Sequence, residues 1–428
     1  MKKIYFFAAA LMCLAACGDG LDLPPVGVET DLDKITLPNS EEGSLEVPLK
    51  AETEPMIHDG ALHSAEDFAR VRQNLTLSPW KEGYEKLCRN SHAQVGYNPR
   101  PTEIIVRGGG VGENYMQAAN DAAAAYQLGL RWKITGEAQY ADRAVYIMNT
   151  WAAICKSLGG DSNVSLGAGI YGFEFAVAGE LLRDYEGWAS DDFKAYQDWM
   201  LNVFYPANND FLVRHHGTPD GHYWANWGLC NVASIMAIGI LADRRDLYNE
   251  AIEHFQIGKT NGCINKAIYH VFDGDDANLA QWQETNRDQG HTYMCQGLMG
   301  TICQLAWIQG DDFFSYNDNM FLKACEYTAK YNYANLNVPN VPYTREYKGA
   351  WGTAYEEHPT ISDRLIQDRP IWALVYYHYA KVKGVDAVKY RYTEMATNAN
   401  APEGGGGDYG GNSGGYDALG CGTLMYAR

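Results

Sequence analysis

Paired helical patterns, each ended by glycine, constrain the fold of this chain more than any other feature. The stretch that begins at Asn114 keeps helical spacing up to Gly136. The next stretch carries apolar residues at helical spacing from Ala141 to Ala152 and stops at the Gly-Gly pair that begins at Gly159. Similar pairs are predicted at about 172–206, 222–258, 290–330 and 366–382. Strand-like alternation is scarce, so the sequence predicts an all-α fold.

A row of helical hairpins can build either an open α-solenoid or a closed (α/α) toroid. No fixed repeat period is visible, and the loops between the hairpins are long and rich in Tyr, Trp, Gly and Asp. Long loops over a helical scaffold usually carry function. We therefore predict an (α/α) toroid of about six to seven hairpins that forms one domain, residues 56–428. The glycine run at 401–415 is interpreted as a long loop within this domain.

The N-terminus predicts export and a lipid anchor. A basic start is followed by an apolar run that is too short to span a bilayer and ends in small residues before Cys17. This pattern resembles a bacterial lipobox, so residues 1–17 are predicted to be a lipoprotein signal peptide with Cys17 lipidated. The alternative is an ordinary secretory signal with a chance cysteine. Residues 18–55 are rich in Pro, Gly and acids and are predicted to be a flexible tether. We expect a lipoprotein of a Gram-negative-type cell envelope, periplasmic or anchored to the outer membrane.

Charge narrows the possible partners. The formal net charge of −19 makes the chain a poor ligand for nucleic acids and anionic membranes. We expect no nucleic-acid partner, contact with a membrane only through the lipid anchor, and a monomer. A cluster of Arg and His inside a cleft could still bind a polyanion, because a cleft focuses its own field.

Cysteine and acid spacing predict no metal or other cofactor. No Cys-x-x-Cys motif or Cys/His spacing typical of metal sites is present. Several cysteines lie within apolar helical patterns and are interpreted as small core residues. The acidic stretch "DGDDAN" at 273–278 could hold Ca²⁺, but it lacks the EF-hand pattern.

Two short stretches carry candidate chemistry. In "GHYWANW", His222 and Asn226 are four residues apart at a predicted helix start and share a face. In "ETNRDQGHTYMCQG", Arg287 and His291 have the same spacing, and Tyr293 follows. Tyr293 points more than a third of a turn away from both in an ideal helix, so these groups converge only if Arg287 lies in the preceding loop. The alternative is structural: capping by His222 and Asn226, a buried Tyr293, and an Arg287–Glu284 pair.

Further polar and aromatic residues could line a saccharide groove, although each is also compatible with packing or capping. Flat aromatic faces bind sugar rings and arginine binds carboxylates. Arg107 stands before glycines that lack the context of a phosphate loop, so no nucleotide site is expected there. The candidate substrate-binding residues are Asn114, Tyr115, Tyr171, Glu174, Gln289, Trp351 and Arg369.

With these residues in view, the chain resembles the alginate-lyase group of (α/α)-toroid polysaccharide lyases, and most of all polysaccharide lyase family 38, which includes lyases of alginate and glucuronan. That group carries an Asn-His-Ser-Tyr-Trp-Ala-Ala-Trp segment, and "GHYWANW" matches it when one residue is skipped. The match implies that His222 is the catalytic histidine. Gly221 stands where the group has an Asn, and Asn226 is a conjectural substitute. The group also has an Arg before a catalytic Tyr, which implies these roles for Arg287 and Tyr293, with His291 as the neighbouring histidine.

The resemblance implies metal-independent β-elimination on a polyuronate. The carboxylate would be neutralised by Asn226, Arg287 and His291, and Tyr293 would protonate O4. On glucuronate or mannuronate Tyr293 could be both base and acid, whereas guluronate requires His222 as the base. The hypothesis predicts that Tyr293→Phe abolishes activity.

Three other functions remain open at this point. An inverting glycoside hydrolase on the same toroid would use two carboxylates, such as Glu174 with Glu284 or Asp288. A non-catalytic glycan-binding lipoprotein would hold oligosaccharides on a flat aromatic surface. A helical-repeat scaffold for protein partners is less favoured because no period is present.

Overall fold

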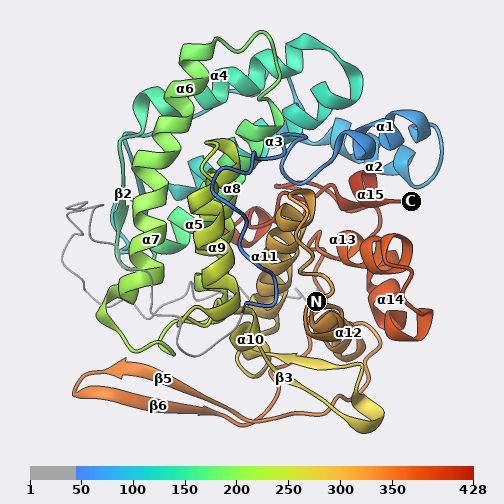
Figure 1. The fold of residues 1–428 in the computed structure, drawn as a ribbon. Coiled ribbons are helices and arrows are strands. Elements are labelled where there is room, and N and C mark those ends of the chain that lie inside the picture. The colour runs from blue at the N-terminus through green and yellow to red at the C-terminus, as the bar shows by residue number, and fades with distance from the viewer. Residues whose placement is uncertain (1–44) are drawn as a thin grey trace, which may run out of the picture.

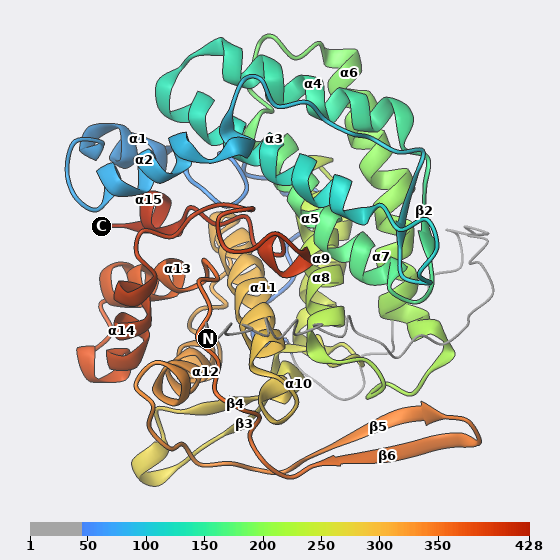
Figure 2. The same cartoon turned by 180° about the vertical axis from the view of Figure 1, so that it is seen from behind.

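The computed structural model describes residues 45–428. Three long helices lie at the centre of the molecule in both views: α5 (Val164–Leu181), α8 (Ala225–Leu241) and α11 (Gln289–Ile308) (Figures 1 and 2). Helix α3 (Tyr115–Thr135) packs beside α5. Further helices pack around these four: α4 (Ala138–Ile154), α6 (Ser190–Trp199), α7 (Tyr205–Arg214), α9 (Arg245–Ile257) and α12 (Tyr316–Asn332). This arrangement of paired helices is the predicted (α/α) toroid.

Shorter helices complete the fold. The N-terminal pair α1 and α2 lies against α15, close to the C-terminus (Figure 1). Their bounds are α1 (Ala65–Asn74), α2 (Trp80–Arg89), α10 (Ile264–Ala267), α13 (Trp372–Tyr377), α14 (Arg391–Asn400) and α15 (Gly422–Tyr426). The predicted pairs up to residue 330 correspond to α3 with α4, α5 with α6, α8 with α9 and α11 with α12. The pair predicted at 366–382 is wrong, because this stretch holds the single helix α13 and the next helix begins only at Arg391.

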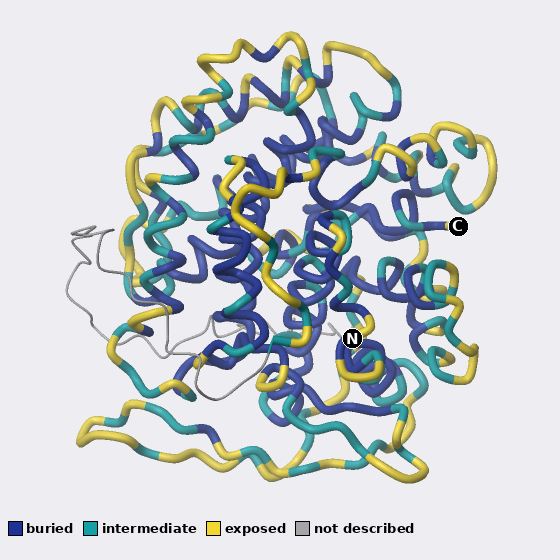
Figure 3. Tube along the Cα trace, viewed as in Figure 1, coloured by how far each residue is buried: buried dark blue, intermediate teal, exposed yellow. Residues whose placement is uncertain are grey.

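The central helices are apolar on every side, and this composition explains their position. Every residue of α8, and every residue of α5 after Val164, is buried. A helix without a polar face is stable in water only when other elements surround it. Small residues allow these two helices to approach closely, since a Cβ atom on Gly169 would lie 2.3 Å from the sulfur of Cys230. Figure 3 shows this buried centre enclosed by a more exposed outer layer.

Strands are few and occur as two-stranded pairs. Strand β1 (Ile104–Arg107) pairs in parallel with β2 (Ser157–Gly160), and this pairing holds Arg107 opposite Gly160. Strand β3 (Ile268–Val271) pairs antiparallel with β4 (Ala280–Trp282). Strands β5 (Tyr343–Gly349) and β6 (Gly352–His358) form a long antiparallel ribbon along one side of the molecule (Figure 1).

The glycine run lies inside the domain, as expected, and is packed against helices. Gly404, Gly405 and Gly406 are buried, and the amide of Gln127 donates to the carbonyl of Gly406 over 3.1 Å. A Cβ atom on Gly406 would lie 2.7 Å from the Cβ of Ala123 on α3, so the backbone here approaches too closely for a larger residue. The run is therefore part of the packed structure.

The packed part of the chain begins earlier than the predicted domain boundary at residue 56. Gln256 on α9 accepts from the backbone of Val47 and donates to the carbonyl of the same residue over 2.9 and 2.8 Å. Asn249 donates to the carbonyl of Lys50 over 2.8 Å. Residues 47–50 of the predicted tether therefore lie along α9. The predicted signal peptide, Cys17 and the rest of the tether up to residue 44 lie outside the described residues.

Two further findings concern the described part of the chain. Of the eight cysteines between residues 45 and 428, all but Cys88 are buried, in agreement with their interpretation as core residues. No helix within the same range is long and apolar enough to cross a membrane.

Glu403 makes stability depend on pH. The carboxyl is buried, and its Oε1 accepts from the backbone N–H groups of Trp372 and Ala373 at the start of α13, over 2.7 and 3.0 Å. Burial raises the pKa of Glu403 to about 7, although these hydrogen bonds oppose the rise. Because the folded-state pKa lies above the unfolded value, the stabilisation is complete below the unfolded pKa and is lost as pH rises through about 7.

We expect Glu403 to account for a loss of roughly 2–3 kcal/mol in the free energy of unfolding between acidic and mildly alkaline pH. Glu403→Gln cannot ionise and should remove this part of the pH dependence. Denaturant unfolding of both proteins at pH 5 and pH 8 measures the difference. An equally steep decline in the variant would contradict the assignment.

Candidate active site

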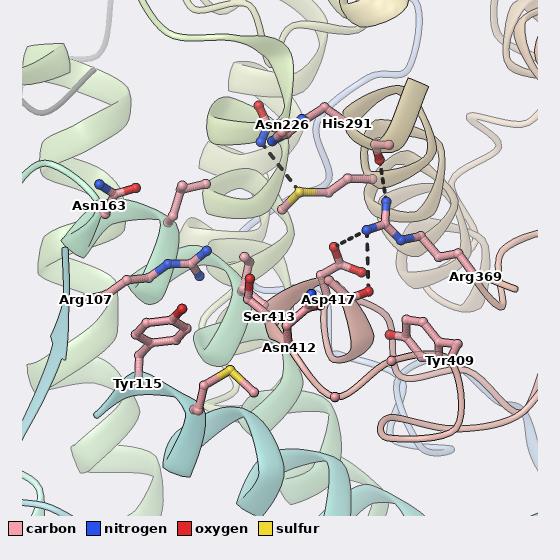
Figure 4. Close-up of a pocket in the computed structure, with 18 of the residues that line it drawn as sticks. Arg107, Tyr115, Asn163, Asn226, His291, Arg369, Tyr409, Asn412, Ser413 and Asp417 are labelled. Atoms are coloured by element: carbon pink, nitrogen blue, oxygen red, sulfur yellow. Dashed lines mark hydrogen bonds and ion pairs between the residues drawn. The ribbon is translucent and has the colours of Figure 1, made fainter. Parts of the chain in front are cut away.

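A cavity of about 640 Å³ opens where the central helices begin. Asn163 immediately precedes α5, Asn226 is the second residue of α8 and His291 is the third residue of α11, and all three line the cavity. Helix N-termini carry a partial positive charge and unpaired N–H groups, so their convergence favours an anionic ligand. We call this cavity the central pocket (Figure 4).

Arg107 brings a guanidinium to the central pocket from the end of β1. Its Nη1 donates to the hydroxyl of Tyr171 over 3.0 Å, and its Cζ lies 4.9 Å from the ring centre of Tyr115. Tyr115 stacks on Tyr171, with ring centres 6.3 Å apart. These contacts hold the planar guanidinium from one edge and one face, and Figure 4 shows it extending into the pocket. Such a group can bind a carboxylate through two parallel hydrogen bonds.

Asn226 offers a buried amide at the pocket wall. Asn226 is fully buried, and its Nδ2 donates to the sulfur of Met294 over 3.5 Å. Among the described residues no hydrogen bond reaches its Oδ1. A buried amide oxygen without a partner costs free energy, so a ligand that donates a hydrogen bond here would gain from satisfying it.

His291 is oriented by the residue that caps its helix. Asp288 accepts from the backbone N–H of His291 over 2.8 Å, and the same oxygen lies 3.3 Å from His291 Nδ1. Burial opposes ionisation of Asp288, but the hydrogen bonds from His291 and the nearby Arg287 charge hold the pKa of this carboxyl well below its usual range. A carboxylate beside one ring nitrogen fixes the orientation of an imidazole and supports proton transfer at the other nitrogen.

The opposite wall comes from the C-terminal part of the chain. Arg369 donates to the carbonyl of Gly290, and its Nη2 lies 3.0 Å from Asp417 Oδ2 (Figure 4). Arg369 therefore links Asp417 of the C-terminal segment to Gly290 at the start of α11. Burial raises the pKa of Asp417, while Arg369 and His291 oppose the rise. Asn412 and Ser413 also line the pocket on this wall.

The structure separates the predicted catalytic residues into two groups. Asn226 and His291 line the central pocket, whereas Tyr293, Arg287 and His222 lie outside its lining. Tyr293 is buried on another side of α11, and its hydroxyl donates to the carbonyl of Leu365 over 2.7 Å. Burial, and then the neighbouring Tyr333, raise the pKa of Tyr293 above its ordinary value.

The side chains of Arg287 and His222 both have partners within the fold, outside the central pocket. Arg287 pairs with Glu284 over 3.1 Å, and its Cζ lies 4.8 Å from the ring centre of Trp224. The buried ring of His222 accepts from the backbone N–H of Lys348 over 2.8 Å. The Arg287–Glu284 pair is the structural alternative considered from the sequence, and the catalytic roles of Arg287, His222 and Tyr293 stay predictions.

Of the predicted substrate-binding residues, Tyr115 and Arg369 line the central pocket. Tyr171 and Glu174 are buried beneath it, and Tyr171 holds Arg107. Gln289 is buried and bonded to Thr285, Ser362 and Asn332 over 2.8–3.1 Å. Asn114 bonds to the backbone of β1. Trp351 is fully exposed between β5 and β6.

Sequence reasoning missed several residues of the central pocket. Asn163 directly precedes α5, which begins at Val164, before the start that was predicted at about 172. Asn412, Ser413 and Asp417 lie in the glycine-rich segment, where no periodic pattern indicates which side chain faces a cavity. No group of three or more His, Cys, Asp and Glu side chains suited to a metal ion occurs within residues 45–428.

Comparison with known proteins identifies the family. A family model described as alginate lyase matches residues 104–337, more than half of the chain. The chain belongs to the alginate lyase family. It is therefore a polysaccharide lyase, as the resemblance implied. The matched range includes Arg107, Asn163, Asn226 and His291, and it ends before Arg369 and the glycine-rich segment.

Solved structures of alginate lyases share this fold. An alginate lyase from Bacteroides ovatus has a TM-score of 0.52 and 13% identity, covering 87% of this chain and 100% of its own. A variant of alginate lyase A1-III complexed with a tetrasaccharide has a TM-score of 0.56 and 14% identity, covering 87% of this chain and 97% of its own. At this level of identity the similarity shows the (α/α) toroid itself. The comparison with curated proteins gave no match.

Proposed function

We propose that this alginate lyase family member cleaves a polyuronate of the alginate or glucuronan type by metal-independent β-elimination. The observation that carries the proposal is the convergence of Arg107, Asn226 and His291 on one pocket at the N-termini of central helices. The tetrasaccharide bound by alginate lyase A1-III supports an acidic saccharide as the substrate. The resemblance to polysaccharide lyase family 38 supports glucuronan as a candidate beside alginate.

The first requirement of the reaction is to neutralise the carboxylate at C5. Negative charge builds up on this group when the C5 proton leaves, and neutralisation stabilises the enolate-like intermediate. Arg107 supplies a positive charge in a planar fork, and the amide NH2 of Asn226, at the start of α8, can donate a hydrogen bond to the carboxylate. The N-termini of α5, α8 and α11 add their partial positive charges. A chain with a net charge of −19 can thus hold a polyanion at this place.

The second requirement is proton transfer. A base takes the C5 proton, the C4–O4 bond breaks as a C4–C5 double bond forms, and O4 receives a proton. We assign the base to His291, because this imidazole lines the pocket and is oriented by Asp288. On mannuronate or glucuronate the C5 proton and O4 lie on the same side, so His291 can return the proton to O4. On guluronate the C5 proton and O4 lie on opposite sides. There Tyr115, whose phenol lines the pocket, could donate the proton to O4.

The product tests the reaction type directly. Cleavage of mannuronan, guluronan or glucuronan by the wild-type protein should produce an unsaturated uronate that absorbs in the ultraviolet, in the presence of a chelator as well as in its absence. An inverting glycoside hydrolase would shorten the same chains without this absorbance. Failure to produce absorbance on every polyuronate would overturn the proposal.

Tyr293→Phe separates the two roles considered for Tyr293. Since its hydroxyl donates to Leu365, we expect the variant to lose about 1 kcal/mol of stability and to keep turnover within about threefold of the wild type. Absorbance assays and thermal unfolding measure both quantities. Loss of turnover with the fold intact would instead support the sequence-based hypothesis that Tyr293 protonates O4.

A further inference from the structure

The wall of the central pocket that faces Arg107 lies outside the part of the chain that matches the family. The family match ends at residue 337, whereas Asn412, Ser413 and Asp417 line the pocket from the C-terminal segment. These three side chains are therefore candidates for contacts with the sugar that the family match alone does not indicate.

The tip of this segment, residues 407–418, is held in place by hydrogen bonds within the segment itself. Gly407 donates to the carbonyl of Gly415 over 3.0 Å, and Gly415 donates to the carbonyl of Asn412 over 2.8 Å. The hydroxyl of Tyr409 donates to the carbonyl of Ala418 over 2.7 Å and accepts from the N–H of the same residue over 2.9 Å. Asp417 also pairs with Arg369, which in turn donates to the carbonyl of Gly290 on α11. A tip fixed in this way presents its side chains without paying further ordering entropy on binding.

Three side chains of the tip, Asn412, Ser413 and Asp417, have polar atoms available to bind a ligand. Within residues 45–428, the fold uses neither the amide of Asn412 nor the hydroxyl of Ser413 in a side-chain hydrogen bond, although both residues line the pocket. Asp417 is 6% exposed, and its Oδ1 has no hydrogen-bond partner among the described residues, while its Oδ2 pairs with Arg369. A buried carboxyl oxygen at a pocket wall gains from a hydroxyl partner and repels another carboxylate.

The two walls differ in the groups they can bind. Arg107 and the helix N-termini favour the carboxylate of a uronate, whereas Asp417, Asn412 and Ser413 favour hydroxyl groups (Figure 4). In a 4-linked uronate the carboxylate on C5 and the hydroxyls on C2 and C3 lie on opposite edges of the ring. A sugar with its carboxylate at Arg107 would thus turn its C2–C3 edge toward the C-terminal wall.

We propose that Asn412, Ser413 and Asp417 bind the O2 and O3 hydroxyls of the uronate in the central pocket and make the enzyme sensitive to the configuration at C2. This inference rests on the proposed lyase function. Mannuronate and glucuronate differ at C2 and share the configuration at C5, so the same elimination geometry applies to both. A site that hydrogen-bonds a hydroxyl discriminates strongly against the sugar that places it elsewhere.

The experiment compares mannuronan with glucuronan as substrates of the full chain. The wild type, the double variant Asn412→Ala/Ser413→Ala and the control Asn398→Ala are assayed by the absorbance of the unsaturated product. Asn398 is an exposed residue of α14 outside the pocket, so its variant repeats the Asn-to-Ala change away from the substrate. Asn412 and Ser413 are not buried, so the double variant should fold, and thermal unfolding verifies this.

We expect the ratio of kcat/KM on the two polymers to change about tenfold in the double variant and to stay constant in Asn398→Ala. Asp417→Asn keeps the shape of the side chain and should move the ratio in the same direction. A wild type that treats both polymers alike, or a ratio that changes by less than about threefold in the double variant, would overturn the inference. A wild type that cleaves no polyuronate would instead overturn the proposed function.

Discussion

His291→Ala is expected to lower kcat about 10³-fold on the best polyuronate substrate while the protein remains folded. The imidazole lines the central pocket and lies beside Asp288, so its removal takes away the base that we assign to the C5 proton. Absorbance assays over a range of substrate concentrations measure the loss in kcat.

A second histidine supplies the control for this variant. His270 lies on β3, contacts the ring of Phe272 and is not part of the pocket lining, so His270→Ala should keep turnover close to that of the wild type. Retention of more than about a tenth of wild-type kcat in His291→Ala would contradict its role as the base. Thermal unfolding of both variants excludes loss of the fold as the cause.

Arg107→Ala should reduce kcat/KM about 10³-fold, because it removes the charge that meets the C5 carboxylate. Arg107→Lys is expected to recover part of this loss. Lysine restores the positive charge, but it cannot form the planar pair of hydrogen bonds or stack on Tyr115. The difference between the two variants therefore measures the contribution of geometry beyond charge.

Two further variants make the test of Arg107 specific. Tyr171→Phe removes the hydroxyl that accepts from Arg107 and leaves the guanidinium in place, so we expect a loss of about tenfold in kcat/KM. Arg391→Ala removes an exposed arginine of α14 and should have no effect. Near-normal kcat/KM in Arg107→Ala would contradict carboxylate binding at this residue.

The helical architecture could be predicted because its signals are local. Glycine stops and apolar residues at helical spacing occur within each segment, and the helix from Tyr115 to Thr135 ends at Gly136 in a left-handed conformation, as its sequence predicted. The apolar composition of α5 and α8 likewise determines that they are central. The local signals do not distinguish an open solenoid from a closed toroid. The absence of a fixed repeat period favoured the toroid.

The candidate site was only partly predictable, and helix α11 shows why. The sequence placed His291 and Tyr293 near a helix start, but spacing alone does not say which side of a helix faces a cavity. Packing decides this rotation: Tyr293 meets the ring of Trp372 and the carbonyl of Leu365, so His291 and Met294 turn toward the pocket. Both partners of Tyr293 lie more than 70 residues further along the chain.

By itself the sequence determined the helices, the apolar centre and the stretches that begin α8 and α11, because these depend on neighbouring residues. The tertiary structure alone decided that Arg107, at the end of a short strand, shares a pocket with Asn226 and His291. It also decided that the glycine-rich C-terminal segment forms the facing wall, held by Arg369 and Asp417. These groups come together through contacts between distant parts of the chain, and no local pattern records such contacts.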